Sequence, residues 1–417
     1  MSDPIIHRHR NGRSAVDYGN PAWETARRSG LIDIRVDYAD AKSLVRDDGH
    51  AFVNLCSCSY LGLHNDPRIL EGAISAIRRT GALDLPISRI RLRLNLLQDL
   101  EDGLSEIFDA PTISAVTSSS ATAGVLPLIA SGHLSPDGAS PLMIFDKHAH
   151  FSMDYIKPIC ADETEVVTCR HNDLDFIEDT CRKRRDVAYV CDGVYSMGGL
   201  APIDDLLVLQ DRYGLFLFID DSHALSLYGE TGRGFARSAM DEVNDRTVIV
   251  ASLGKAFGGS GGAIMLGPIH AEDLITRFGG PLAWSQGLNV PGVGAGIASV
   301  ELHRSPDLTK LQAALRRNIA LFDELVPTDQ AGNGVPLRVI TLGDEDRSVE
   351  ASRRMLERGY YTSAVFFPIV RRGSAGLRVM LRADLTENDI RDFATALGAT
   401  IDEVGGADTD LQRADAA

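Results

Sequence analysis

The chain has 417 residues, of which 44% are hydrophobic, so we expect a large buried core that is shared between one large domain and a smaller one. Its formal net charge of -16 at pH 7 argues against a nucleic-acid partner, because phosphate backbones bind basic surfaces. No stretch approaches the ~18 consecutive apolar residues of a membrane helix, and the polar start lacks the apolar core of a signal peptide, so we expect a cytoplasmic protein that binds no membrane.

The first 45 residues are expected to form an N-terminal arm with one short helix. They are polar, and they are interrupted at Gly19-Asn20-Pro21 and at Gly30. Further along, apolar residues recur at helical spacing from Leu70 to Thr80 and again from Leu96 to Phe108. The pattern therefore predicts two helices after the arm.

Four short, continuously apolar runs follow, and helical stretches separate them. Such runs are typical of parallel strands that are covered on both faces, and functional groups then gather at the carboxyl ends of the strands. The runs at 142–145, 187–191, 215–219 and 247–251 end in Asp146, Asp192, Asp220 and Ser252. We expect Asp146, His150, Asp192, Asp220, His223 and Lys255 to converge on one edge of the resulting sheet.

The pattern changes after Pro291. A helical stretch at 308–325 is followed by short apolar runs at 337–340 and 377–381 and by a final helix that begins at Glu387. The last residues are small, polar and acidic. We therefore expect an arm at 1–45, a large domain at 46–290, a small α+β domain at 291–404 and a disordered tail at 405–417.

The segment around Lys255 indicates an enzyme that uses pyridoxal phosphate (PLP). Lys255 follows Ser252 and precedes the glycine-rich run 258–262, which suits an amine that forms a Schiff base with PLP while nearby backbone approaches the phosphate. Asp220 ends a buried strand, and its carboxylate suits the pyridine nitrogen, which it would keep protonated. No metal is expected, because Cys56-Ser57-Cys58 has no matching second pair and the six cysteines are scattered.

Three blocks in this order resemble the α-oxoamine synthases, a branch of the fold-type I PLP-dependent enzymes. The resemblance covers roughly residues 50 to 395, and its blocks lie at 192–202, at 220–234 with Asp220-Asp221-Ser222-His223, and at 252–262. It implies a fold-type I PLP-dependent transferase of α/β class, in which helices cover a mostly parallel sheet and a smaller α+β domain follows. It also implies a homodimer with a shared active site.

The resemblance implies a role for each residue that matches. Lys255 would form the Schiff base, Asp220 would pair with the pyridine nitrogen, and His223 would hydrogen-bond the phenolic oxygen of the cofactor. His150 would stack on the ring, with His148 as the alternative at this position. The remaining cofactor-binding residues are Ser119, Ser120 and Ala121 at the phosphate loop, together with Ser196 and Ser252.

The substrate end departs from the family. Arg378 matches the arginine that grips the amino-acid carboxylate, and a guanidinium can do this through two parallel hydrogen bonds. Ser59 stands where the family has asparagine, and Leu225-Ser226 stands where it has Thr-Gly. Arg89 belongs to an alternating run with arginines at 91 and 93, which is interpreted either as a strand face that meets an anionic donor or as a solvated basic strand.

The function that these residues imply is a PLP-dependent C-acyltransferase. It would condense an amino acid with an acyl thioester of coenzyme A or of a carrier protein, usually with decarboxylation, to give an α-amino ketone. One alternative is a PLP enzyme that acts on an amino acid without an acyl donor, as a decarboxylase, lyase or aminotransferase. Another is a catalytically silent PLP-binding protein, against which the presence of both Lys255 and Asp220 argues.

Overall fold

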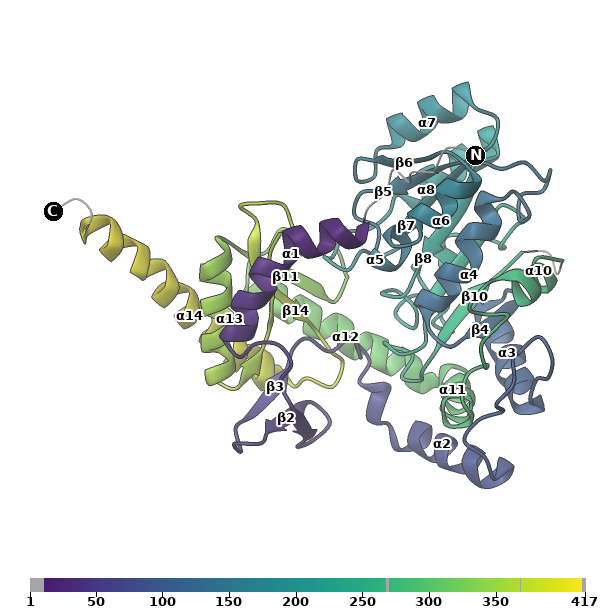
Figure 1. Ribbon diagram of the computed structural model, residues 1–417. Coiled ribbons are helices and arrows are strands. Elements are labelled where there is room, and N and C mark those ends of the chain that lie inside the picture. Colours follow the sequence, from purple (N-terminus) through teal and green to yellow (C-terminus); the bar gives the residue numbers. More distant parts are fainter. Residues whose placement is uncertain (1–10, 268–269, 368, 415–417) are drawn as a thin grey trace. The chain divides into compact units, whose positions relative to one another are not determined.

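The computed structural model describes residues 11–267, 270–367 and 369–414 (Figure 1). The described chain forms two compact units. The first is Leu63–Gln312, and the second joins Gly12–Gly62 to the described residues from Ala313 onward. These boundaries differ from the predicted ones, because the stretch 46–62 belongs with the C-terminal unit and the stretch 291–312 with the first.

A seven-stranded sheet forms the centre of the first unit, in the order β4-β10-β9-β8-β7-β5-β6. Only β10 runs antiparallel to its neighbours, so the predicted mostly parallel sheet is confirmed. The four predicted strands are present, and each ends at the polar residue that was expected to end it. The strands are β4 Thr112–Ala115, β5 Leu142–Asp146, β6 Val166–Cys169, β7 Val187–Asp192, β8 Phe216–Asp220, β9 Thr247–Ser252 and β10 Gly262–Met265.

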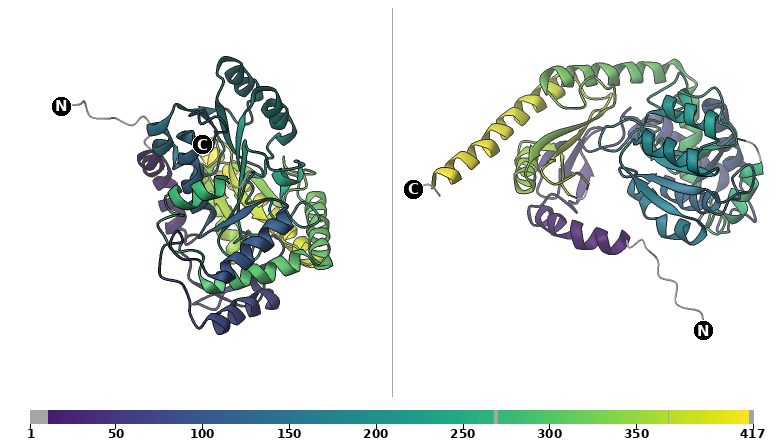
Figure 2. Two further views of the ribbon diagram at one scale, coloured as in Figure 1. Left: turned by 90° about the vertical axis from the view of Figure 1, so that its right-hand side faces the viewer. Right: turned by 90° about the horizontal axis from the view of Figure 1, so that it is seen from above.

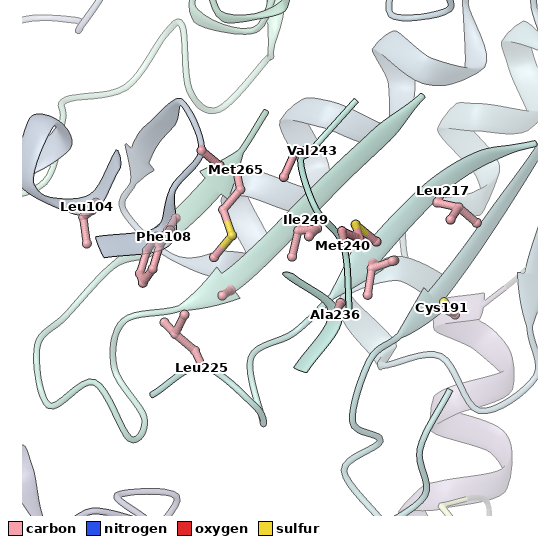
Figure 3. Packing of buried hydrophobic residues seen from close by; sticks show 14 of the residues in the cluster. Leu104, Phe108, Cys191, Leu217, Leu225, Ala236, Met240, Val243, Ile249 and Met265 are labelled. Carbon is pink, nitrogen blue, oxygen red and sulfur yellow. The ribbon is translucent and has the colours of Figure 1, made fainter. Parts of the chain in front are cut away.

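Both faces of this sheet are buried, which explains the continuously apolar strands. In β8, Leu217 and Ile219 face one hydrophobic cluster while Phe216 and Phe218 face another, since successive side chains of a strand point to opposite faces. Figure 3 shows part of the first cluster, which contains both Leu217 of β8 and Phe108.

Helices supply the other half of each cluster. Residues of α3, α7, α8 and α11 pack in the first cluster, and residues of α4, α6 and α10 pack in the second. The predicted helices at 70–80 and 96–108 correspond to α2 and α3. The helices of this unit are η1 Leu63–Asn65, α2 Pro67–Thr80, α3 Asn95–Phe108, α4 Ser118–Ala130, α5 Phe151–Asp154, α6 Lys157–Glu163, α7 Leu174–Lys183, α8 Ile203–Tyr213, α9 Phe235–Ser238, α10 His270–Phe278 and α11 Val290–His303, and the boundary between the units falls within α12 Pro306–Leu325.

The second unit is the smaller α+β part of the chain. Its antiparallel sheet β11-β14-β13 lies beside α13, and a second sheet has the order β1-β2-β3-β12. The strands are β1 Val36–Tyr38, β2 Ser43–Arg46, β3 Ala51–Asn54, β11 Leu337–Gly343, β12 Tyr360–Tyr361, β13 Ser363–Val365 and β14 Ala375–Met380, and the helices are α1 Asn11–Arg28, α13 Glu345–Glu357 and α14 Glu387–Ala414.

Both terminal segments are more helical than the sequence suggested. Helix α1 continues through Pro21, where we expected a break. Helix α14, drawn in yellow in Figure 2, begins at the predicted Glu387 but continues past residue 405, where we expected a disordered tail. Acidic and small polar residues do not prevent a helix once a buried face has started it. Within the described ranges, no helix has the length and apolar character to cross a membrane.

Candidate active site

The centre of the candidate site is a contact between Lys255 and His223. Lys255 lies in the loop that follows β9, and His223 lies in the turn that follows the neighbouring parallel strand β8. Lys255 Nζ is 2.8 Å from His223 Nε2, and His223 is 5% exposed. An ammonium group can only donate a hydrogen bond, so Lys255 Nζ is the donor in this contact and His223 Nε2 is the acceptor. The two parallel strand ends therefore bring a nucleophilic amine and a possible proton acceptor together.

Two carboxyl groups lie at adjacent strand ends beside this pair. Asp192 of β7 and Asp220 of β8 are register partners, and both are buried. Burial, together with the negative charge of Asp220, raises the pKa of Asp192 well above its usual range, while the N–H of His150 and the charge of Lys255 act in the opposite direction. Asp192 therefore favours the protonated form. Asp220 accepts a 2.9 Å hydrogen bond from the backbone N–H of Ser222, and it remains the predicted partner of the pyridine nitrogen.

The two candidate histidines, His148 and His150, have different contacts in the structure. The backbone N–H of His150 donates to Asp192 Oδ2 at 2.8 Å, which ties this residue to the strand end that pairs with Asp220. The ring of His148 instead stacks on His171, with 4.3 Å between ring centroids. This arrangement supports His150 as the residue nearer to the site.

Helix α4 begins at the predicted phosphate loop. Thr117 is its N-cap and forms a capping box with Ser120, whose hydroxyl donates to Thr117 O at 2.7 Å. The hydroxyl of Ser120 is therefore engaged in the cap, while the first backbone N–H groups of an α-helix have no partner within the helix and attract anions. A Cβ at Gly262 would lie 2.6 Å from Ser118 N, so only glycine lets β10 approach this helix end so closely.

The other predicted cofactor residues lie near these strand ends in the chain. Ala121 is fully buried in the first turn of α4. Ser252 ends β9, and its hydroxyl accepts from Gly254 N at 3.2 Å. Ser196 is partly buried in a turn that is closed by a 2.8 Å hydrogen bond from Gly198 N to Tyr195 O.

Sequence reasoning missed the partners of Asp146. Burial raises the pKa of this carboxyl, but hydrogen bonds from His171, Asn172, the His148 backbone and Tyr189 more than offset it, so that the net pKa is lowered. The group joins β5 to the segments that follow β6 and to β7. No recognised spacing marks His171 and Asn172 in the sequence. In the structure Asn172 has a positive φ of 54°, a conformation that asparagine adopts more readily than most residues.

Arg378 and Ser59 lie in the second unit. Arg378 is on β14, opposite Val339 and Ser363, and Ser59 is 5% exposed. The segment before Ser59 is tied to the end of β14 by a 2.8 Å hydrogen bond from Met380 N to Leu55 O. This unit therefore holds the predicted substrate-binding pair, and the first unit holds the predicted cofactor-binding groups.

Arg89 does not lie on a strand, which corrects the expectation of an arginine-bearing strand face. Residues 89–91 form a turn, in which Arg91 N donates to Ser88 O at 2.9 Å. The Arg89 guanidinium is buried and contacts Glu101 at 2.6 Å and Ser114 O at 2.8 Å. Its hydrogen bonds hold α3 against β4, so we do not carry Arg89 forward as a substrate-binding residue.

The groups of the first unit fit PLP. They combine a lysine amine beside an imidazole, a buried carboxyl at a strand end, and a helix N-terminus that β10 approaches closely at Gly262. This sheet and this set of groups define a fold-type I PLP-dependent enzyme.

Comparison with protein families matches residues 51–397 to the aminotransferase class I and II family, and the chain belongs to this family. Among curated relatives, 8-amino-7-oxononanoate synthase of Petrotoga mobilis is 29% identical over 380 residues, which is 87% of this chain and 92% of the relative. The enzyme of the same name from a Mycobacterium species (strain JLS) is 30% identical over 352 residues, 83% of this chain and 88% of the relative.

Solved structures agree on the fold. A serine palmitoyltransferase of Sphingomonas wittichii superposes with a TM-score of 0.79 at 20% identity, covering 93% of this chain and 97% of that one. An 8-amino-7-oxononanoate synthase of Francisella tularensis superposes with a TM-score of 0.69 at 18% identity, covering 84% and 98%. The predicted family resemblance, fold class and cofactor are confirmed.

Proposed function

We propose that the protein is a PLP-dependent C-acyltransferase. It joins Cα of an amino acid to the carbonyl carbon of an acyl thioester, releases the thiol and usually CO2, and yields an α-amino ketone. The observation that carries this proposal is the 2.8 Å contact of Lys255 Nζ with His223 Nε2, at strand ends that also hold the buried Asp220. The names of the curated relatives, which are 8-amino-7-oxononanoate synthases, support the reaction class.

Each proposed cofactor contact follows from the chemistry of the residue. Lys255 would bind the aldehyde carbon of PLP, Asp220 would hold a proton on the pyridine nitrogen, and His150 would pack on the ring. The N-terminus of α4, with Ser119, Ala121 and the hydroxyl of Ser252, would bind the phosphate. Bound PLP supplies an electron sink that weakens the bonds at Cα of an attached amino acid.

Lys255 would also act as the general base. Its Nζ, once no longer bonded to the cofactor, can take the Cα proton. The neighbouring His223 Nε2 is within hydrogen-bond distance of that amine and can hold it in place. Arg378 would bind the carboxylate of the amino acid through two parallel hydrogen bonds, and Ser59 would lie beside it.

The test is product analysis with and without a thioester. The purified, PLP-loaded protein is incubated with a panel of amino acids and with acyl thioesters of coenzyme A or of acyl carrier protein, and α-amino ketone and CO2 are measured. We expect amino ketone only when a thioester is present, no product with Lys255→Ala, and unchanged product with Lys183→Ala, a control at an exposed lysine of α7. Turnover of an amino acid without any thioester would favour a decarboxylase, lyase or aminotransferase.

The assembly and the location are part of the proposal. We propose a homodimer with a shared active site, which sedimentation analysis tests directly: a mass of one chain at all concentrations would contradict it. We also propose a cytoplasmic location, which the free thiols of all six cysteines support.

A further inference from the structure

One face of α11 contacts two segments of the candidate site. Ser299 and His303 lie one turn apart on this helix, and both are buried. Ser299 Oγ donates to Phe257 O at 2.5 Å, and His303 Nε2 is 2.8 Å from Ser226 Oγ. Phe257 follows Lys255 by two residues, and Ser226 follows His223 by three. The helix therefore holds both loops whose functional groups meet.

The direction of the His303 hydrogen bonds follows from its partners. His303 Nδ1 is 2.7 Å from Ser299 O, and a carbonyl oxygen can only accept, so Nδ1 carries the proton. Burial lowers the pKa of His303 to about 4, which leaves the ring neutral near pH 7. Nε2 is then an acceptor, and the hydroxyl of Ser226 donates to it.

Ser226 has a backbone conformation that usually belongs to glycine. Its φ is 71°, in the left-handed region, and the residue is fully buried. Its N–H donates to Gly232 O at 2.7 Å, and its carbonyl oxygen accepts from Gln312 Nε2 at 3.0 Å. The hydrogen bond to His303 adds a third fixed contact, through the side chain that a glycine would lack.

The loop of Lys255 is held in a comparable way. Gly258 N donates to Lys255 O at 3.0 Å, which closes the turn, and the φ of Gly258 is 79°. The ring of Phe257 lies against the ring of His303, with 4.7 Å between centroids. His303 therefore contacts the two segments at once, by a hydrogen bond on one side and by ring packing on the other.

We propose that His303 is a positioning residue of the active site: through Ser226 and Phe257, and together with Ser299, it sets the separation between His223 Nε2 and Lys255 Nζ. This inference deepens the proposed function, on which it rests. His303 contacts Ser226 and Phe257, one in each loop, so we infer that it acts through the two loops.

The test measures the chemical reactivity of the Lys255 amine and its rate of PLP capture, before any substrate is present. Competitive labelling of the cofactor-free protein with an amine-reactive reagent, followed by peptide mass spectrometry, gives the reactivity of Lys255 as a function of pH, and the rate of PLP capture is followed by absorbance. We expect His303→Leu to change the labelling rate and the PLP capture rate by about fivefold or more, as the loss of one hydrogen bond would. His303→Gln should restore both, because its amide can donate to Ser299 O while its oxygen accepts from Ser226.

Two smaller changes keep the test decisive if His303→Leu does not fold. Ser226→Ala removes only the hydroxyl and should reproduce the change, whereas Ser226→Gly also relaxes the left-handed backbone. Folded His303→Leu and Ser226→Ala proteins with the Lys255 pH profile and PLP capture rate of the unmodified protein would overturn the proposal. If the unmodified protein itself fails to capture PLP at Lys255, the proposed function fails instead.

Discussion

Replacing Asp221 by asparagine should remove a pH-dependent cost from the folded protein. Asp221 directly follows Asp220 and is fully buried, and a Cβ at Gly193 or Gly234 would lie 2.2 or 2.3 Å from its carboxyl oxygens. Oδ2 accepts from Ala236 N at 3.0 Å, while Oδ1 has no hydrogen-bond partner among the described residues. Burial, with a further contribution from the charge of Asp220, raises the pKa of Asp221 from 3.8 to about 7.

The magnitude and its sign follow from this pKa. A carboxyl whose pKa is higher in the folded state loses stability as pH rises, because the unfolded chain ionises first. The cost of Asp221 therefore develops between about pH 4 and pH 7 and is constant above that, at about 4 kcal/mol for a shift of about three units. Asparagine has the same shape and does not titrate in this range.

The assay compares the free energy of unfolding by urea at pH 4.5 and at pH 8, with the cofactor removed. The amide can accept from Ala236 N as Oδ2 does, and any cost of its unpartnered NH2 group is the same at both pH values. We expect the stability of Asp221→Asn relative to the unmodified protein to increase by about 3 kcal/mol from the lower to the higher pH. An equal difference at both pH values would refute the reasoning, because Asp221 would then titrate alike in the folded and unfolded chains.

Three further changes test other parts of the structure. Gly262→Ala should weaken PLP binding, measured by absorbance titration, because its Cβ would lie 2.6 Å from Ser118 N; unaltered affinity would contradict the close approach. Glu101→Gln should lower the free energy of unfolding by about 3 to 5 kcal/mol, since it leaves the buried Arg89 without its carboxylate; a loss below about 1 kcal/mol would show that the ion pair contributes little. Arg378→Lys should raise the KM for the amino acid about tenfold or more, because an ammonium group cannot form two parallel bonds, and an unchanged KM would argue against carboxylate binding there.

The sheet was predictable because its buried strands appear in the sequence as short, continuously apolar runs. Strands covered on both faces must be apolar throughout, and the runs before Asp192 and Asp220 show this. Their parallel pairing then places the residues that follow at one edge, as the contact of Lys255 with His223 illustrates. The start of the last helix at Glu387 was predictable from its helical periodicity.

The remaining features depend on contacts between residues far apart in the chain. The alternating arginines that include Arg89 suggested a strand, but the buried position of Arg89 is set by Glu101, twelve residues further on, and no local pattern shows that partner. The left-handed Ser226 and its partner His303 are separated by 77 residues. The two compact units differ from the predicted domains for the same reason, since the stretch 46–62 pairs with a strand that follows three hundred residues later.

The most direct test of the central claim is Cα hydrogen exchange in heavy water. The PLP-loaded protein is incubated with a panel of amino acids, with and without acetyl-CoA, and the loss of the Cα proton signal is followed by NMR for the unmodified protein, Lys255→Ala and Lys183→Ala. We predict exchange with one amino acid or a narrow group of them, abolished in Lys255→Ala and unchanged in Lys183→Ala. Exchange that continues at the same rate in Lys255→Ala would contradict the assignment of Lys255 as the base that removes the Cα proton.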